Sequence, residues 1–448
     1  MKKIVSIIAL GCSLVVSAQT YTLQQLKDAA MQNNIAIRNA QSNVDAAQQQ
    51  RKEAFTKYFP NVSAVGGWFN TNNGMAQTDI YPSELIPPEL AGQLAQSFSP
   101  EVLAALAGPT TVTMMKDGVI LGVTATQPVF AGGQIVNGNR LAKIGEEVSR
   151  LQLELSENEV EKQTEVYYWQ LVTLQEKKKT IEAAEALLAD IGKDVEVAVK
   201  AGVAMKNDLL QVQLRQNETE SQKIKLQNGI SIVRMILAQY CALESDTFSV
   251  VIPDDDDMVN LPQMQDPASS LLSLPEYQLL QKQVQATDLQ RKMEIGKYLP
   301  TAAVGGGYNF HNVLGNNHSF GMVFATVSVP ITDWWGGSHA IKRKKIAQRQ
   351  AQEQMEDNAE LLKIRMQKSW NEVEEAILQL TISQRSIEQA EENLRINRNH
   401  YKAGVSRMSD LLEAQMLYQQ AMDKHTDATA NYRNKLLEYR QATGMDRD

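Results

Sequence analysis

Apolar and polar residues alternate in four short segments of the chain. A period of two residues is typical of a β-strand with one apolar face. The apolar positions are Val62, Ala64, Gly66 and Trp68; Val119, Leu121, Val123 and Ala125; Ala302, Val304, Gly306, Tyr308 and Phe310; and Val323, Ala325, Val327 and Val329. We therefore predict strands at about 61–70, 117–128, 300–311 and 319–330. Strands of about ten residues can cross a bilayer when they are tilted in a barrel.

Two much longer segments have helical periodicity. Residues 134–200 and 338–402 contain no proline. Their apolar residues recur at heptad-like intervals, which predicts rods of roughly 100 Å. The positions are Ile181, Ala184, Leu188, Ile191 and Val195 in the first segment, and Leu380, Ile387, Leu394 and Tyr401 in the second. Shorter helices are predicted at about 23–57, 207–240, 274–297 and 407–443.

The two halves of the chain repeat one another. Lys200-Ala201-Gly202-Val203, followed by Asp208-Leu209-Leu210, returns as Lys402-Ala403-Gly404-Val405, followed by Asp410-Leu411-Leu412. A repeated unit of this kind indicates duplication. We predict a first repeat at 19–243, a linker at 244–270 and a second repeat at 271–448, with helix-connecting tips at 201–206 and 403–406.

The first eighteen residues have the layout of a cleaved signal peptide, with Lys2 and Lys3 ahead of an apolar run. Cys12 follows Gly11, but the residues before it fit a lipoprotein cleavage site poorly. Cys241 is then the one cysteine of the mature chain, so no intrachain disulfide is expected. The net charge of −8 gives no reason to expect a nucleic-acid partner.

Four strands are too few to close a membrane barrel, because the smallest contain about eight. Several copies must therefore share one barrel, and this argument leaves two or three copies open. A helical bundle below a barrel has an evident use in continuing the pore. The resulting fold class is a mixed α and β membrane protein, with a shared barrel extended by long helices.

The duplicated unit, the prolines between helices and strands, and the two tip motifs resemble the TolC family of outer-membrane efflux proteins. The resemblance covers nearly the whole mature chain. It implies a homotrimer in the outer membrane of a Gram-negative bacterium, with a twelve-stranded barrel and a periplasmic α-helical barrel. It also implies two partners, a periplasmic adaptor protein and an inner-membrane efflux pump or ABC transporter. The cargo would be small molecules or proteins, and their identity cannot be predicted from this chain.

The resemblance also implies roles for individual residues. The adaptor would dock on the two tips, at Ala201, Gly202, Val203, Ala403, Gly404 and Val405. The periplasmic gate would comprise Asp410, Glu413, Asp208, Tyr401 and Arg407. Asp410 and Glu413 share a helix face, and symmetry would repeat them as acidic rings. The family's gate also uses an arginine directly after the position of Val405, where this chain has Ser406 and carries Arg407 one place later.

Trp334 and Trp335 follow the fourth predicted strand and precede Lys342-Arg343-Lys344-Lys345. Indole rings and long cationic side chains suit a lipid headgroup layer, so we predict that both tryptophans are membrane-interface anchors. Ordinary packing beside a solvated basic face is the alternative. The acidic run Asp254–Asp257 lacks the spaced ligands of a calcium loop and is interpreted as a solvated linker.

Residues 69–116 separate the first two strands and have no counterpart in the second repeat. Prolines interrupt this segment, and 101–107 could form a short helix. Long loops lie on the outer side of such barrels. The segment is either a lid over the exit or an exposed surface loop.

No enzyme, cofactor or metal motif emerges from the sequence. Gly133–Gly138 has the spacing of a phosphate loop, but Asn139-Arg140 follows where lysine and serine or threonine are required. Two other functions remain as alternatives. A structural coiled-coil protein of the cell surface would explain the long helices but not the strands, and a passive porin would explain the strands but not the helices.

Overall fold

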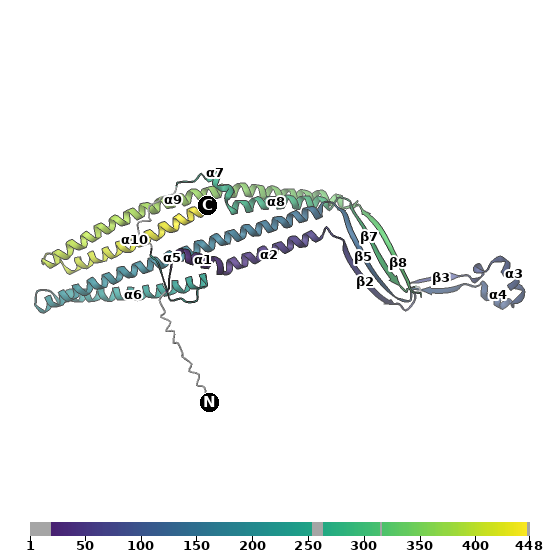
Figure 1. Cartoon of the computed structure of the whole chain (residues 1–448), viewed down its shortest axis with the longest axis horizontal. Helices are drawn as coiled ribbons and strands as arrows, with labels where there is room; N and C mark the ends of the chain where they lie inside the picture. The colour runs from purple at the N-terminus through teal and green to yellow at the C-terminus, as the bar shows by residue number, and fades with distance from the viewer. Residues whose placement is uncertain (1–18, 253–262, 314–315, 446–448) are drawn as a thin grey trace, which may run out of the picture. The chain divides into compact units, whose positions relative to one another are not determined.

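The computed structural model describes residues 19–252, 263–313 and 316–445 (Figure 1). The predicted signal peptide with Cys12 and the acidic run Asp254–Asp257 lie outside these residues. The chain forms two compact units. The helical unit contains Met1–Gln48, Gly145–Val284 and Gln350–Asp448, and the sheet unit contains Gln49–Ile144 and Gln285–Arg349. Helices α2, α5, α8 and α9 contribute residues to both units.

The sheet unit contains a four-stranded antiparallel sheet in the order β2-β5-β7-β8. The strands are β2 (Asn61–Asn70), β5 (Asp117–Ala131), β7 (Thr301–His311) and β8 (His318–Ser328). β5 extends beyond the predicted end at 128, because a bulge between Pro128 and Phe130 lets pairing with β7 continue past the proline. β2 and β8 are the edges, and neither pairs with a further strand among the described residues.

The segment between β2 and β5 is folded. It contains β3 (Ala76–Ile80), the short helix η1 (Pro82–Leu85), α3 (Pro88–Ser97), α4 (Pro100–Ala107) and β4 (Thr110–Met114). β3 and β4 pair with each other as a separate ribbon that carries α3 and α4 at its end (Figure 1). Three prolines of the segment, Pro82, Pro88 and Pro100, begin these helices, because proline is well tolerated in the first helical turn.

The helical unit is built on two antiparallel helical hairpins. α5 (Gln134–Lys200) turns into α6 (Lys206–Cys241), and α9 (Asp333–Lys402) turns into α10 (Met408–Thr443). α9 begins at Asp333 rather than at the predicted 338 and contains Gly336 and Gly337 in its first turns. Shorter elements complete the unit: β1 (Gln19–Tyr21), α1 (Leu23–Asn33), α2 (Ile35–Thr56), β6 (Phe248–Val250), α7 (Pro267–Ser270), η3 (Leu271–Ser273) and α8 (Pro275–Gly296).

The predicted first helix at 23–57 is interrupted at Asn34. This residue is buried and takes an extended conformation between α1 and α2. Its side-chain amide donates to the carbonyl oxygen of Tyr240 at 3.0 Å and accepts from the backbone N–H of Ala36 at 2.8 Å. Asparagine side chains that bond the backbone compete with helix continuation, which explains the break.

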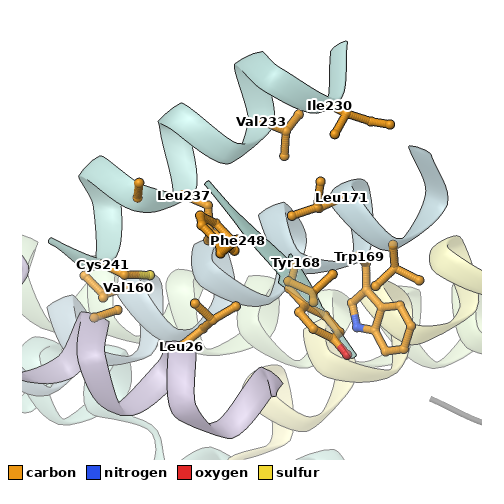
Figure 2. Packing of buried hydrophobic residues seen from close by; sticks show 14 residues of the cluster. Leu26, Val160, Tyr168, Trp169, Leu171, Ile230, Val233, Leu237, Cys241 and Phe248 are labelled. Carbon is orange, nitrogen blue, oxygen red and sulfur yellow. The ribbon is translucent and has the colours of Figure 1, made fainter. Parts of the chain in front are cut away.

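A hydrophobic core joins α1, α5, α6 and β6 (Figure 2). Leu26, Leu171, Leu237 and Cys241 are completely buried there. β1 pairs in parallel with β6, and the hydroxyl of Tyr168 donates to the carbonyl oxygen of Val251 at 2.5 Å. Burial raises the pKa of the Cys241 thiol to about 12, so this cysteine is a packing residue.

Candidate functional site

One face of the four-stranded sheet is apolar and exposed. The strand register places Trp68 opposite Val119, Leu121 opposite Phe310, and Val323 opposite Gly306, so the predicted apolar positions of all four strands share that face. Val323 is 91% exposed and Trp68 is 70% exposed in the single chain. An apolar face of this extent requires a lipid or protein cover.

Aromatic side chains lie where the sheet meets the helices. Trp335 is 82% exposed and Trp334 is 52% exposed. The indole N–H of Trp334 donates to the carbonyl oxygen of Tyr298 at 3.0 Å, and this bond orients its ring. Gly337 is buried, and a Cβ there would overlap the ring of Tyr298.

The two helix-connecting tips have the same backbone geometry. Gly202 and Gly404 have φ angles of +74° and +72°. At the first tip, the N–H of Val203 donates to the carbonyl of Ala198 at 2.9 Å and that of Gly202 to Val199 at 3.1 Å. The second tip has the equivalent pair of bonds at Val405 and Gly404. This is a Schellman motif, which requires a left-handed residue where each glycine stands.

The outer surface of both tips is open. Val203 is 79% exposed and Val405 is 72% exposed. A Cβ built on Gly202 or Gly404 would meet no atom within 4 Å. The backbone conformation therefore requires glycine at both tips. No part of the described chain fills the space outside these glycines.

The aspartates that follow the tips cap helices. The backbone N–H of Met205 donates to Asp208 Oδ2 at 3.1 Å, and that of Arg407 donates to Asp410 Oδ2 at 3.2 Å. A carboxylate in the first turn also interacts favourably with the positive end of the helix dipole. Repetition of Asp208 and Asp410 thus has a structural reason besides any role in a gate. Glu413 is exposed one turn further along α10.

A cavity of about 1030 Å³ separates the two tips within one chain. Asp208, Tyr401 and Arg407 all line it, whereas Asp410 and Glu413 do not. Burial, followed by the nearby carboxylate of Asp208, raises the pKa of the Tyr401 hydroxyl. The structure therefore brings together the first-repeat aspartate and the second-repeat tyrosine of the predicted gate.

An apolar cluster beside the cavity holds the hairpins together. It consists of Ile191, Val195, Val212, Met408 and Leu411, with Tyr401 packed against it. Tyr401, a residue of the predicted gate, therefore packs between one hairpin and the other.

Hydrogen-bonded polar side chains between α10 and the first hairpin were not predicted from the sequence. Gln415 and Gln419 are buried there. Arg215 Nε donates to Gln415 Oε1 at 3.3 Å, and Gln419 Nε2 donates to Gln222 Oε1 at 3.1 Å. The residues are separated by about half the chain, so no local pattern could have paired them. Glutamines within otherwise apolar heptad positions were the available signal.

None of the helices in the described part of the chain is both long enough and apolar enough to span a bilayer. The family model for outer membrane efflux proteins matches residues 26–241 and 269–445, which is most of the chain. This chain belongs to the outer membrane efflux protein family. The outer-membrane location and the efflux function predicted from the sequence are thereby confirmed.

Solved channels share the fold of this efflux protein. VceC from Vibrio cholerae has a TM-score of 0.71 at 12% identity, with 94% of this chain and 96% of that chain covered. CusC has a TM-score of 0.77 at 13% identity, with 94% and 91% covered. The CmeC outer membrane channel of Campylobacter jejuni has a TM-score of 0.73 at 15% identity, with 94% and 85% covered. No curated protein sequence matches the efflux protein significantly.

Proposed function

We propose that three copies of this chain form one outer-membrane export duct that receives cargo from an inner-membrane pump through a periplasmic adaptor and catalyses no reaction itself. The observation that carries the proposal is the four-stranded sheet with two open edges and one exposed apolar face. Unpaired strand edges cannot remain within hydrocarbon, so β2 and β8 need neighbours from other copies.

Exposed apolar stripes on the long helices support the same assembly. Leu361, Ile364, Leu378 and Ile382 of α9 are all more than half exposed, and they follow heptad spacing. Leu210, Leu214 and Ile224 are similarly exposed on α6. These apolar stripes lie on helices that already pair within hairpins. They are therefore suited to pack against helices of adjacent copies. Two copies would give eight strands and three would give twelve; the family resemblance favours three.

The tips are the proposed docking surface for the adaptor. They expose small and apolar residues on a backbone fixed by the Schellman motif, which is a rigid surface that recurs at every hairpin of the assembly. Two tips in each of three copies would present six similar surfaces in a ring. A partner with repeated hairpins would fit such a ring.

Asp410 and Glu413 are proposed to narrow the periplasmic entrance. Both are exposed in one chain and share a face of α10. Threefold symmetry would bring three copies of each close to the axis, where like charges attract cations. Asp208 and Tyr401 both line the cavity between the tips. They would help to hold the two hairpins of each copy together when the channel is closed.

Cross-linking between strand edges tests the assembly. One cysteine in β2 and one in β8 are introduced at a series of positions into a Cys241→Ser background, and the protein is oxidised in outer membranes. Shared barrels should yield covalent species of up to three chains at matching positions and none when either cysteine is absent. Cross-linked species of two chains at most, or no cross-linked product for any pair of cysteine positions, would contradict the proposed trimer.

A further inference from the structure

The four segments that adjoin the sheet are strongly basic. Residues 49–57, 134–144, 285–298 and 331–349, which we call the basic collar, contain thirteen Lys or Arg and four Asp or Glu. Their net charge is therefore +9 in a chain whose total is −8. All four segments belong to the sheet unit and join the same end of the antiparallel sheet, so the excess is concentrated in one belt.

Seven of the thirteen cations have a polar or charged partner within the described chain, and the other six do not. Asp288 is paired with Arg291 and Lys292 at 2.9 and 2.6 Å, and Glu294 is paired with Lys297 at 2.8 Å. These pairs use two of the four acids. In the described structure, six further cations have neither an ion-pair partner nor a side-chain hydrogen bond, namely Lys52, Lys57, Arg140, Lys342, Arg343 and Lys345. All six are exposed.

Exposed aromatic rings lie within the collar and directly beside it. Phe55 and Phe59, whose ring centroids are 5.5 Å apart, are each more than half exposed, as are Trp334 and Trp335. Aromatic rings favour the depth of the headgroups in a membrane. Lys342 follows Trp335 by seven residues, or about 10 Å of helix rise. Long cationic side chains extend towards the headgroups, and the potential of an anionic surface acts over about 8 Å.

We propose that the basic collar binds the phosphate groups of anionic phospholipids in the membrane leaflet that faces the periplasm. Several copies of a belt with this charge would repel one another in an oligomer, and bound phosphates relieve that repulsion. The aromatic rings would hold the acyl side of the same lipids. This inference rests on the proposed function in one respect, because it requires the sheet to cross the membrane as part of a channel.

Native mass spectrometry of the purified channel tests the proposal with phosphatidylglycerol and phosphatidylethanolamine as probes. The variant is Lys342→Gln, Arg343→Gln, Lys345→Gln. The control is Lys225→Gln, Arg385→Gln, Lys424→Gln, which removes the same charge from exposed positions of α6, α9 and α10 outside the sheet unit. The parent and control should retain phosphatidylglycerol in preference to phosphatidylethanolamine. The collar variant should lose roughly fivefold in phosphatidylglycerol affinity for each removed charge.

Salt dependence provides a second measurement that needs no variant. Raising sodium chloride should release phosphatidylglycerol from the parent but leave phosphatidylethanolamine retention unchanged, because screening weakens exposed charge interactions. Equal lipid retention by the collar variant and the parent, in oligomers that still export, would overturn the lipid site and leave the proposed channel intact. Preferential retention of lipid A, an outer-leaflet lipid, would overturn the assignment to the periplasmic leaflet. A parent that forms no outer-membrane oligomer would instead refute the channel, and the collar with it.

Discussion

Gly132 and Gly296 meet backbone to backbone where the sheet joins the helices. A Cβ on either residue would overlap backbone atoms of the other. Gly132 also has a left-handed φ angle of +59°, whereas the φ angle of Gly296 is not left-handed. A substitution at Gly296 therefore tests steric overlap without added backbone strain. The junctions after β5 and before β7 are held together by this contact.

Gly296→Ala should therefore lower the free energy of unfolding by about 1 to 3 kcal/mol, because the added methyl group must displace backbone rather than a mobile side chain. Denaturant unfolding of the purified protein in detergent measures the change. Gly145→Ala is the matched control, since it lies within α5 and its Cβ would meet no atom within 4 Å. It should be neutral or stabilising by up to about 1 kcal/mol. Equal effects of both substitutions would show that the contact is unimportant.

A size series at Gly404 should separate docking from backbone strain. Gly404→Ala and Gly404→Trp impose the same left-handed conformation on an L-residue, at a cost of about 1 to 2 kcal/mol. Only the tryptophan projects far into the open space outside the tip. We expect both variants to assemble in the outer membrane, and the tryptophan variant alone to lose adaptor binding and export. Co-purification of the adaptor and an efflux assay measure the two effects, and identical behaviour of the variants would remove the tip from the docking surface.

The acidic pair of α10 should make the closed channel cation-selective and sensitive to a trivalent cation. Asp410→Asn with Glu413→Gln should abolish the block, because neutral amides do not attract the cation. Asparagine is chosen because it preserves an acceptor for the N–H of Arg407, which alanine would leave unpaired.

Single-channel conductance in a planar bilayer, with and without the trivalent cation, provides the measurement. Asp208→Asn is the comparison, and we expect it to have the smaller effect because Gln211 stands where a second charge would be needed. Undiminished block in the double variant would place the constriction elsewhere.

Asp423 should destabilise the helical unit at neutral pH. Its Oδ1 is buried without a hydrogen-bond partner among the described residues. Burial raises the pKa of this carboxyl, the positive charge of Lys177 lowers it, and the carboxylate of Asp427 raises it further. Because the folded-state pKa lies above that of the unfolded chain, the ionised group costs stability at pH 7, and the cost disappears as the pH falls through the raised pKa.

Asp423→Asn should consequently stabilise the protein at pH 7 by about 1 kcal/mol, with a gain that shrinks on acidification. Denaturant unfolding at neutral and acidic pH measures it. Asp190→Asn serves as control, since it breaks an exposed ion pair with Lys193 at 3.8 Å and should change stability little. A pH-independent effect of Asp423→Asn would refute the assignment of the raised pKa.

Removal of the insertion between β2 and β5 should leave the barrel intact. Asn70 is paired with Asp117, so a short Asn-Gly turn can join the strands, and β3 and β4 pair only with each other in the described structure. If the insertion is a lid, its removal should increase the entry of large toxic compounds at unchanged oligomer content. Susceptibility assays and native gels measure these outcomes, and loss of the oligomer would make the insertion a structural element.

Elements whose residues repeat with a clear period are predictable from the sequence alone. Alternation in Ala302–Phe310 and heptad spacing through Ile181–Val195 depend on neighbours along the chain, so they are readable locally. The tip motifs were equally legible because each Schellman turn needs its own glycine and each helix its own capping aspartate.

Features that join distant parts of the chain could not be predicted without the folded structure. The break at Asn34 depends on the carbonyl of Tyr240, and the close approach at Gly132 depends on Gly296. The cavity that brings Asp208 beside Tyr401 lies between tips contributed by separate repeats. The two residues of each pair are more than a hundred positions apart in the sequence. The residues next to either one therefore do not indicate which distant residue it will contact.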